Sequence, residues 1–511
     1  FTIFFLLLPP IGLTYFSKVK NMNQKNLLIS LFATFTLAAI VSLLNFYQLV
    51  SVSPVLLKVV WWLFTAACVL YAFKKRSLTT WILVSMVIGI QIGFEFKELA
   101  HNLQVLSKVF LKLIKTIIGP ILFSTLVVGI AGHSNMKQLG RMGWKSLVYF
   151  EVVTTIALII GLVAINITEA GKNIDVPHTL SSDIPLSKKK ELQKEVIGVM
   201  EGAGIDVPDG LLQKLPDTPA PGWQQHILDI FPENIAKAVA EGQVLPIVVF
   251  SVIFGIALAM LPEEKKRPML NFSESLAETM FKFTNIVMYF APFGVGAAIA
   301  HSTAELGIDI LFALGKLLLT LYAALIVFVL VVLIPVMVFC RIPIKNFFKA
   351  VSEPVSIAFA TTSSESALPK AMENMEKIGV PRHIVSFVLP TGYTFNLDGT
   401  TLYLSLASVF VAQAAGIHMS FGEQLLLGLT LMLTSKGVAG VPRASLVILI
   451  GAAATFGLPL WPIMAILGID ELMDMARTSV NVFGNSLASA VIARWEGELD
   501  DTKLNTEFEI D

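Results

Sequence analysis

The 511-residue sequence has few charged residues and almost no cysteine. Lys, Arg, Asp and Glu make up 14% of the chain, and their formal charges cancel to +0, whereas soluble domains are about a quarter charged. These values exclude an ordinary soluble protein and give no sign of a nucleic-acid partner. The two cysteines, Cys68 and Cys340, lie in or beside apolar runs, so a disulfide framework is excluded and a metal site is not expected.

Motifs of enzymes are also missing. The sequence shows no His/Cys cluster, no Gly-rich phosphate loop after a strand and no nucleophile–base motif. We therefore expect a protein that is not an enzyme and that carries no cofactor.

Apolar residues, by contrast, are abundant: 55% of the chain is hydrophobic and the mean hydropathy is +0.75. Long apolar runs predict an all-α integral membrane protein. A run at 2–16 is short and contains Pro9–Pro10, so we treat it as a doubtful or truncated span; the sequence leaves open whether Phe1 is the natural start. The runs long enough to cross a bilayer lie near 27–50, 55–73, 79–97, 106–132, 146–168, 225–262, 273–302, 311–340, 383–415 and 461–494.

The basic residues predict the orientation of these spans. Lys and Arg cluster in alternate connections, at 74–76, 137–145, 265–267 and 341–349, whereas the connection at 301–310 has neither. Basic loops face the cytoplasm, so we expect the C-terminus there and the polar segment 169–224 outside, as a variable loop. The runs within 27–73 then form an added N-terminal hairpin.

The last span carries a polar stripe, within "GIDELMDMARTSVNVFGNSLASAVIARWE". Its polar residues recur at spacings of three and four, which places them on one helix face. Charges in a span cost at least ~2.5–3.5 kcal/mol each, so the stripe indicates function; the alternative is a salt-bridge ladder that only fixes packing. The stripe consists of Asp470, Asp474, Arg477, Thr478, Asn481 and Asn485.

This stripe suits a zwitterion with a further acid group. Arg477 can hold a carboxylate through two parallel hydrogen bonds. Asp474, one turn earlier, can hold an ammonium group, and Asn481 can serve a second carboxylate or a cation. The chemistry favours aspartate or glutamate over a sugar, a lipid or a metal ion.

Two further apolar stretches, near 348–376 and 421–457, are interrupted by Gly, Pro and Ser. The first contains "AFATTSSESALPKAM" and the second "TSKGVAGVPRASLVILIGAAA". Both are typical of re-entrant hairpins, whose tips expose backbone N–H groups to an anion. Broken segments in a hydrophobic chain point to a transporter binding site.

A third interruption is "GYTFNLDGTTLY" at 392–403, inside a long apolar run. Unwound backbone is tolerated at membrane depth only where it is buried in protein or lines a cavity. Its free carbonyl groups and the carboxylate of Asp398 are oxygen ligands suited to hard cations.

The chain resembles the dicarboxylate/amino acid:cation symporter family, the glutamate transporter homologues, in four motifs that occur in the family's order. They are the serine-rich hairpin, "NLDGT", "GVAGVP" and "DxxxDxxRTxxNVxGN". The resemblance covers roughly 77–495. It implies a homotrimer in membrane lipid, with eight core transmembrane helices and two re-entrant helical hairpins per protomer. In each protomer a mobile transport domain moves like an elevator against a scaffold.

The resemblance also implies a division of the chain, to which we add the N-terminal hairpin. The parts are 1–76 (additional N-terminal segments), 77–145 (scaffold), 146–168 (first transport-domain helix), 169–224 (external loop), 225–302 (scaffold), 311–495 (transport domain with both hairpins) and 496–511 (cytoplasmic tail).

Positions that match the family's substrate contacts are Ser363, Ser364, Thr400, Val441, Pro442, Asp474, Arg477, Thr478 and Asn481. The resemblance implies that Ser364 and Asn481 bind the α-carboxylate and that Asp474 binds the amino group. Arg477 and Thr400 match the contacts to the side-chain carboxylate, with Thr478 nearby, and the Val441–Pro442 tip matches the outer gate.

Two of these residues also bear on the choice of substrate. C4-dicarboxylate transporters of the family usually lack the acid found here at Asp474, so its presence favours an amino acid. Arg477 favours an acidic amino acid over a neutral one.

Positions that match the family's cation ligands are Gly392, Thr394, Asn396, Asp398, Asn481 and Asn485. However, Asn485 stands where sodium-coupled members carry aspartate, and Phe150 and Val153 stand where the sodium pattern has tyrosine and threonine. Fewer oxygens and less negative charge weaken a sodium site. The co-transported ion is therefore expected to be a proton, as in bacterial proton/glutamate symporters.

Glu151 and Glu365 are the candidate proton carriers, because a carboxylate removed from water readily takes up a proton. A structural role for Glu151, as partner of a lysine or of a backbone group, is the alternative. Sodium-coupled transport of an acidic amino acid, or transport of a C4-dicarboxylate, also stays open.

Arg443 in the second hairpin suggests a latch with Glu365 in the first; the alternative is two independent solvent-facing charges. The expected location is the plasma membrane, as a bacterial inner-membrane protein. A pure channel is the remaining rival to a symporter.

Overall fold

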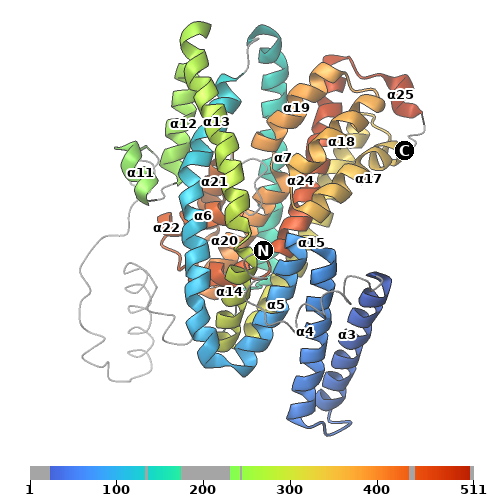
Figure 1. Ribbon diagram of the computed structural model, residues 1–511. Coiled ribbons are helices and arrows are strands. Elements are labelled where there is room, and N and C mark those ends of the chain that lie inside the picture. The colour runs from blue at the N-terminus through green and yellow to red at the C-terminus, as the bar shows by residue number, and fades with distance from the viewer. Residues whose placement is uncertain are drawn as a thin grey trace, which may run out of the picture. The chain divides into compact units, whose positions relative to one another are not determined.

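The computed structural model of the chain describes residues 24–132, 136–172, 174, 231–241, 244–436 and 444–506, and every regular element within them is helical (Figure 1). The all-α prediction is therefore confirmed. The chain divides into two compact units, one formed by Phe1–Phe110 with Met288–Gly307 and the other by Leu111–Val287 with Ile308–Asp511.

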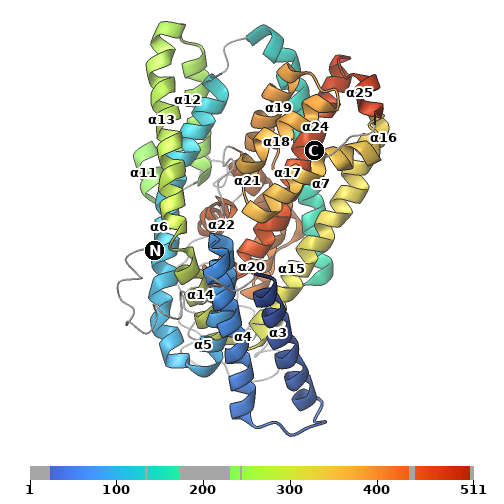
Figure 2. The same ribbon diagram turned by 45° about the vertical axis from the view of Figure 1, so that its right-hand side comes forward.

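The first unit contains the additional N-terminal hairpin. Its helices are α3 (Gln24–Phe46), α4 (Pro54–Lys75), α5 (Leu78–Glu95), the beginning of α6 (Lys97–Ala131) and α14 (Ala291–Leu306). Figures 1 and 2 both show α3 running alongside α4. The indole N–H of Trp61 donates a hydrogen bond to Ser42 Oγ over 3.1 Å, and the ring of Phe35 packs on those of Trp61 and Phe64.

Helices α5 and α14 meet at backbone distance. A Cβ atom on Gly89 would lie 2.4 Å from the carbonyl oxygen of Gly296, so only glycine allows this approach. α14 begins at Ala291 with Pro292 in its first turn, a position that suits proline because the first N–H groups of a helix have no partner within the helix. The apolar run expected near 273–302 is therefore two helices.

The second unit begins with long apolar helices. They are the remainder of α6, α7 (Met136–Thr168), α12 (Val244–Ala259), α13 (Glu263–Met288) and α15 (Asp309–Phe328), with the short α11 (Ile235–Glu241) before α12. α15 continues through a π-helical turn at Val329–Leu333 into α16 (Ile334–Phe339). Pro335 explains the turn: its ring would clash with the carbonyl of Val331 in a regular α-helix, and the wider π-turn relieves that clash.

The hairpins and the broken helix follow. α17 (Ile344–Thr361) and α18 (Ser364–Lys377) form the first hairpin, α19 (Arg382–Phe395) and α20 (Asp398–Ala414) form the broken helix, and α21 (Phe421–Ser435) and α22 (Ala444–Thr455) form the arms of the second hairpin. The tip of the second hairpin lies outside the described residues. α23 (Trp461–Leu467), α24 (Asp470–Glu496) and α25 (Asp501–Asn505) complete the chain, so the run expected at 461–494 is two helices.

Helix α24 lies at the centre of this unit and contacts α7, α15, α17, α18, α19 and α20. A buried cluster of Ala358, Ala367, Tyr393 and Val482 joins the first hairpin to α19 and α24. The polar stripe of α24 is consequently enclosed by protein.

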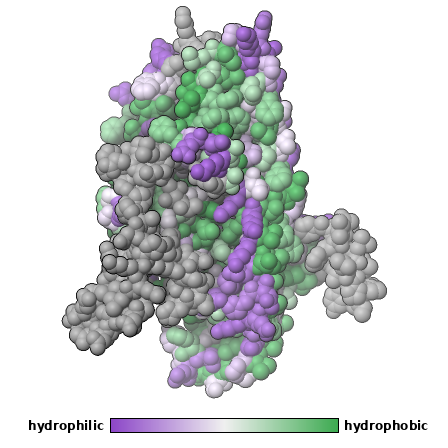
Figure 3. Space-filling view, turned by 90° about the vertical axis from the view of Figure 1, so that its left-hand side faces the viewer, coloured by the Kyte–Doolittle hydropathy of each residue, from purple (hydrophilic) through white to green (hydrophobic). Residues whose placement is uncertain are grey.

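The outer helices have the composition of membrane spans. Six described helices are long and apolar enough to cross a membrane, in α3, α4, α5, α6, α7 and α15–α16, and α13 with α14 makes a seventh if the pair forms one span. Ile253 on α12 is 59% exposed, and Figure 3 shows apolar side chains over much of one face. The chain is a multi-pass membrane protein; the expected eight core spans stay a prediction.

Candidate functional site

The break between α19 and α20 places two polar side chains in the interior. Asn396 and Leu397 leave the helical conformation, with φ of −115° and −104°. Asn396 and Asp398 are both 0% exposed. The Nδ2 group of Asn396 donates to Asp398 Oδ2 over 3.1 Å and to Asn485 Oδ1 over 3.2 Å.

This arrangement leaves two buried oxygens without a hydrogen bond. Neither Oδ1 of Asn396 nor Oδ1 of Asp398 has a hydrogen-bond partner among the described residues. A buried carboxylate oxygen in this condition is costly unless a cation or a proton occupies it. Oxygens of this type are ligands for hard cations.

Two glycines allow the helices to meet around these groups. A Cβ atom on Gly392 would lie 2.1 Å from Asn485 Oδ1, and one on Gly484 would lie 2.5 Å from Asp398 Oδ2. Asn485 also donates from Nδ2 to the carbonyl oxygens of Asn396 (3.1 Å) and Asn481 (2.9 Å). The polar groups of α24 thus stabilise the unwound backbone of its neighbour.

Asn481 binds the beginning of α20. Its Oδ1 accepts from the backbone N–H groups of Gly399 (2.8 Å) and Thr400 (3.3 Å), and its Nδ2 donates to Thr400 Oγ1 over 2.9 Å. The side chain therefore caps two of the N–H groups that have no partner within the helix. The structure brings Asn481 and Thr400 together, as contacts of one substrate would require.

Arg477 is the largest fully buried side chain in the described residues, with 1% exposure. Nε donates to Asp474 Oδ1 over 2.9 Å and Nη1 to Asp470 Oδ1 over 3.1 Å, while Thr478 Oγ1 donates to Asp474 Oδ1 over 2.9 Å. The guanidinium carbon lies 4.2 Å from the centre of the Tyr403 ring. These contacts fix the plane of the guanidinium group.

The other terminal nitrogen of this guanidinium is not used. Nη2 of Arg477 is buried and has no hydrogen-bond partner among the described residues. A buried cationic donor without an acceptor is costly, and a carboxylate is the acceptor that a guanidinium binds best. Two aspartates and a tyrosine thus hold a guanidinium whose Nη2 can donate to an anion.

The tip of the first hairpin lies at Thr362–Ser363, between the two arms. Thr362 takes a left-handed conformation (φ 52°), and Ser363 caps α18 by accepting a hydrogen bond from Ser366 N over 3.3 Å. Ser364 begins α18 and is 6% exposed, whereas Glu365 is exposed. The hairpin predicted from the serines is therefore present in the structure.

Glu151 on α7 forms an ion pair that the sequence left as an alternative. Its Oε1 lies 2.9 Å from Nζ of Lys436, which also donates to the carbonyl oxygen of Phe395 over 2.9 Å. Lys436 is 8% exposed. An ammonium group thus binds the backbone of the residue that precedes Asn396.

Sequence reasoning missed Lys436 and Tyr403. The available signal for Lys436 was a single charge in the second broken stretch, within "TSKG". Tyr403 gave no signal, because an aromatic residue in an apolar helix is ordinary.

The remaining predicted residues lie as follows. Thr394 is in the last turn of α19 and partly buried, and Phe150 and Val153 are buried on α7. Val441, Pro442 and Arg443 lie outside the described residues, so the gate and the Glu365–Arg443 latch stay predictions.

Comparison with known proteins places the chain in a family. The family model described as "Sodium:dicarboxylate symporter family" matches residues 78–495. The proton/sodium-glutamate symport protein of Geobacillus stearothermophilus is 40% identical over 435 residues, which cover 84% of this chain and 97% of that protein.

Two other relatives differ in the substrates that their names state. The proton/glutamate-aspartate symporter of Escherichia coli (strain K12) is 41% identical over 437 residues, covering 84% of this chain and 95% of that protein. The C4-dicarboxylate transport protein of Pseudomonas syringae pv. tomato is 39% identical over 439 residues, covering 85% of this chain and 89% of that protein. The α3–α4 hairpin precedes the matched residues, and the chain belongs to the sodium:dicarboxylate symporter family.

Proposed function

We propose that this protein is a secondary active symporter that imports glutamate or aspartate together with protons. The observation that carries the proposal is the buried Nη2 of Arg477, which has no acceptor among the described residues. The side-chain carboxylate of an acidic amino acid supplies that acceptor, and Thr400 and Thr478 supply hydroxyl groups. Relatives at about 40% identity are named for glutamate or glutamate–aspartate symport.

The other end of the substrate meets different groups. The ammonium binds Asp474, and the α-carboxylate binds Asn481 and the N-terminal turn of α18, to which Ser363 and Ser364 contribute. The presence of Asp474 favours an amino acid over a C4-dicarboxylate, because without an ammonium partner its buried charge would repel the ligand.

Two features near the broken helix support proton coupling. Asn485 contributes no charge, and the ammonium of Lys436 already binds the Phe395 carbonyl. Both reduce the negative potential available to a mobile sodium ion. Glu151 and Glu365 are the proposed proton carriers; protonation of Glu151 would remove the anionic partner of Lys436.

Sodium coupling is the second candidate, and one observation favours it. The two unpartnered buried oxygens on Asn396 and Asp398 are suited to a hard cation. In this reading Gly392, Thr394, Asn481 and Asn485 would complete the ligand set.

Transport itself proceeds by an elevator movement in a homotrimer of the bacterial inner membrane, with the C-terminus in the cytoplasm. The second hairpin, at Val441–Pro442, acts as the outer gate. The arms of the first hairpin, α17 and α18, contact α24, and the arms of the second, α21 and α22, contact α20, which itself contacts α24. These contacts support movement of both hairpins with α24 as one body.

The decisive experiment is uptake of labelled L-glutamate into proteoliposomes under crossed gradients. A pH gradient without sodium should drive accumulation, and a sodium gradient at equal pH should not. Strict dependence on sodium at constant pH would overturn proton coupling. Excess L-aspartate should abolish uptake of the label and succinate should leave it unchanged; the reverse would overturn the amino-acid assignment.

A further inference from the structure

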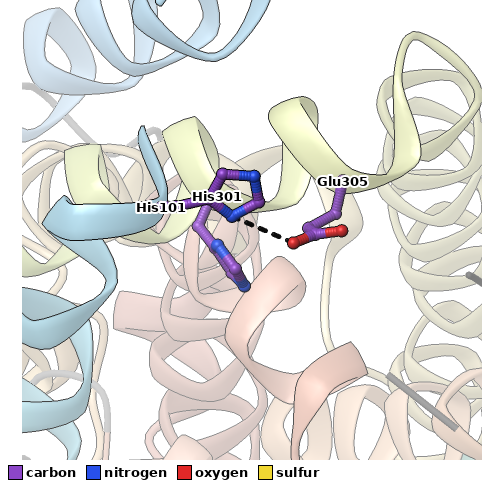
Figure 4. Close-up of side chains that lie close together, drawn as sticks. All are labelled: His101, His301 and Glu305. Atoms are coloured by element: carbon purple, nitrogen blue, oxygen red, sulfur yellow. Dashed lines mark ion pairs between the residues drawn. The ribbon is translucent and has the colours of Figure 1, made fainter. Parts of the chain in front are cut away.

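Two histidines and a glutamate meet in the first unit, away from the substrate site. His101 is on α6, and His301 and Glu305 are one turn apart on α14 (Figure 4). One ligand atom from each of the three lies within 4.8 Å of the others. The sequence did not reveal this cluster, because His101 and His301 lie far apart in the chain and only folding brings them together.

The contacts within the cluster are already close. His101 Nδ1 lies 3.0 Å from Glu305 Oε1, and the two imidazole rings are 5.6 Å apart at their centres. His101 and Glu305 are 47% and 17% exposed in their side chains, so solvent reaches the cluster. His301 is 8% exposed.

One nitrogen of this buried histidine has no partner. Nδ1 of His301 makes no hydrogen bond to any described residue, whereas Nε2 lies 2.7 Å from Nε2 of Gln104. Turning the Gln104 amide by half a turn places its oxygen there as the acceptor for His301 Nε2–H, and the lone pair of the imidazole is then on Nδ1. Metal-binding histidines are held in this way, with the second ring nitrogen donating to an oxygen.

We propose that His101, His301 and Glu305 form a site for a divalent transition metal ion, with Zn²⁺ as the expected occupant. Two imidazoles and one carboxylate, with a water as fourth ligand, are a frequent zinc set. The ion replaces the direct His101–Glu305 contact and joins the beginning of α6 to the end of α14. In the orientation that the basic loops predict, this end faces outside.

The charges around the cluster set the strength of the site. Glu305 attracts a cation, and the exposed Lys108, one turn beyond Gln104, opposes it. The two helices are already packed, and the three ligand atoms lie within 4.8 Å of one another. Side-chain rotations are therefore enough to bring these atoms to the spacing of ligands around one metal ion.

The test is Zn²⁺ titration of the full-length, detergent-purified protein without a polyhistidine tag. We expect one ion per chain, and a Tm that rises with free Zn²⁺ because the ion binds the folded state. His301→Ala and Glu305→Gln should each abolish both effects, and Gln104→Ala should weaken binding by about 10-fold. His383→Ala is the matched control, since His383 pairs with Glu498 elsewhere, over 3.2 Å, and should bind normally.

A second variant gives a positive signal that loss of folding cannot imitate. His101→Cys keeps a ligand of a different type, so its Co²⁺ complex should show a thiolate charge-transfer band that wild-type protein lacks. The proposal is overturned if wild-type protein binds no Zn²⁺, if His301→Ala and Glu305→Gln bind as wild type does, or if His101→Cys binds Co²⁺ without the new band.

Discussion

Arg477 and Arg494 lie on the same helix, α24, and each binds aspartate. Arg494 donates from Nη1 and Nη2 to both oxygens of Asp501, over 3.0 and 2.7 Å, and Nε and Nη2 also donate to the carbonyls of Cys340 and Arg341. Arg477 is as firmly held through Nε and Nη1, yet its Nη2 has no partner among the described residues.

The two arginines differ in their burial and in whether their hydrogen-bonding groups are paired. The Arg494–Asp501 pair is partly exposed, with side chains 24% and 62% accessible. It fixes the end of α24 and contributes little to the free energy of unfolding. The group around Arg477 is buried and incomplete, and in the proposed function a ligand carboxylate completes it. Changes at Arg477 should therefore alter transport, and changes at Arg494 or Asp501 should alter stability slightly.

The largest effect is expected for Arg477→Lys. A lysine keeps the charge but loses the planar fork that meets Asp470, Asp474 and a ligand carboxylate at once. Glutamate uptake should fall by about 100-fold or more, since removal of a charged hydrogen bond and its supporting pairs costs several kcal/mol. Arg494→Lys is the control in the same assay and should keep uptake within about twofold of wild type.

Asp398→Asn should have the second-largest effect and reduce glutamate uptake by about 10- to 100-fold. The amide removes the anionic oxygen that has no partner but keeps the size of the side chain. Asp501→Asn makes the same chemical change in the exposed pair and should transport normally. Equal uptake by wild type and Asp398→Asn, at matched protein amounts, would remove Asp398 from the cation path.

Lys436→Met should change coupling more than rate. Loss of the ammonium frees the carbonyl of Phe395 and the carboxylate of Glu151 for a mobile cation. Uptake should become sodium-stimulated by about three- to tenfold at constant pH. The readout is the sodium dependence of initial rates, and an unchanged dependence on both ions would show that Lys436 only packs.

The smallest effect is expected for Asp501→Asn in thermal unfolding. The hydrogen bonds from Arg494 lower the pKa of Asp501 below its usual value. A carboxyl group with a lowered folded-state pKa stabilises the protein above its unfolded pKa of about 3.9 and loses that effect as pH falls through the folded value. The variant should melt no more than about 3 °C below wild type at pH 7, and the gap should close below about pH 4.

Much of the fold could be predicted from the sequence because the pattern of polar and apolar residues within one helix determines it. The stripe of Asp474, Arg477 and Asn481 follows from helical spacing, and the break at Asn396–Leu397 follows from polar residues and glycine within an apolar run. The π-turn before Pro335 and the break at Tyr289–Phe290 were not predicted, because proline occurs both inside helices and at their beginnings.

Contacts between distant segments were beyond the sequence. Nothing in the order of residues pairs Lys436 with Glu151 or places Tyr403 on Arg477, because these contacts depend on how helices pack. His101 and His301 are near span ends in the sequence, and only the packing of α6 on α14 brings them together. The roles of the substrate and cation residues stay predictions until transport is measured.

The most direct test is the preference for L-glutamate over L-glutamine, measured as binding to purified protein. These ligands differ only in the group that would meet Arg477 Nη2. Wild-type protein should prefer glutamate by about 100-fold or more. In the charge-balanced double variant Asp470→Asn with Arg477→Gln, the preference should fall towards 1. A double variant that binds glutamate with undiminished affinity and preference would contradict the account.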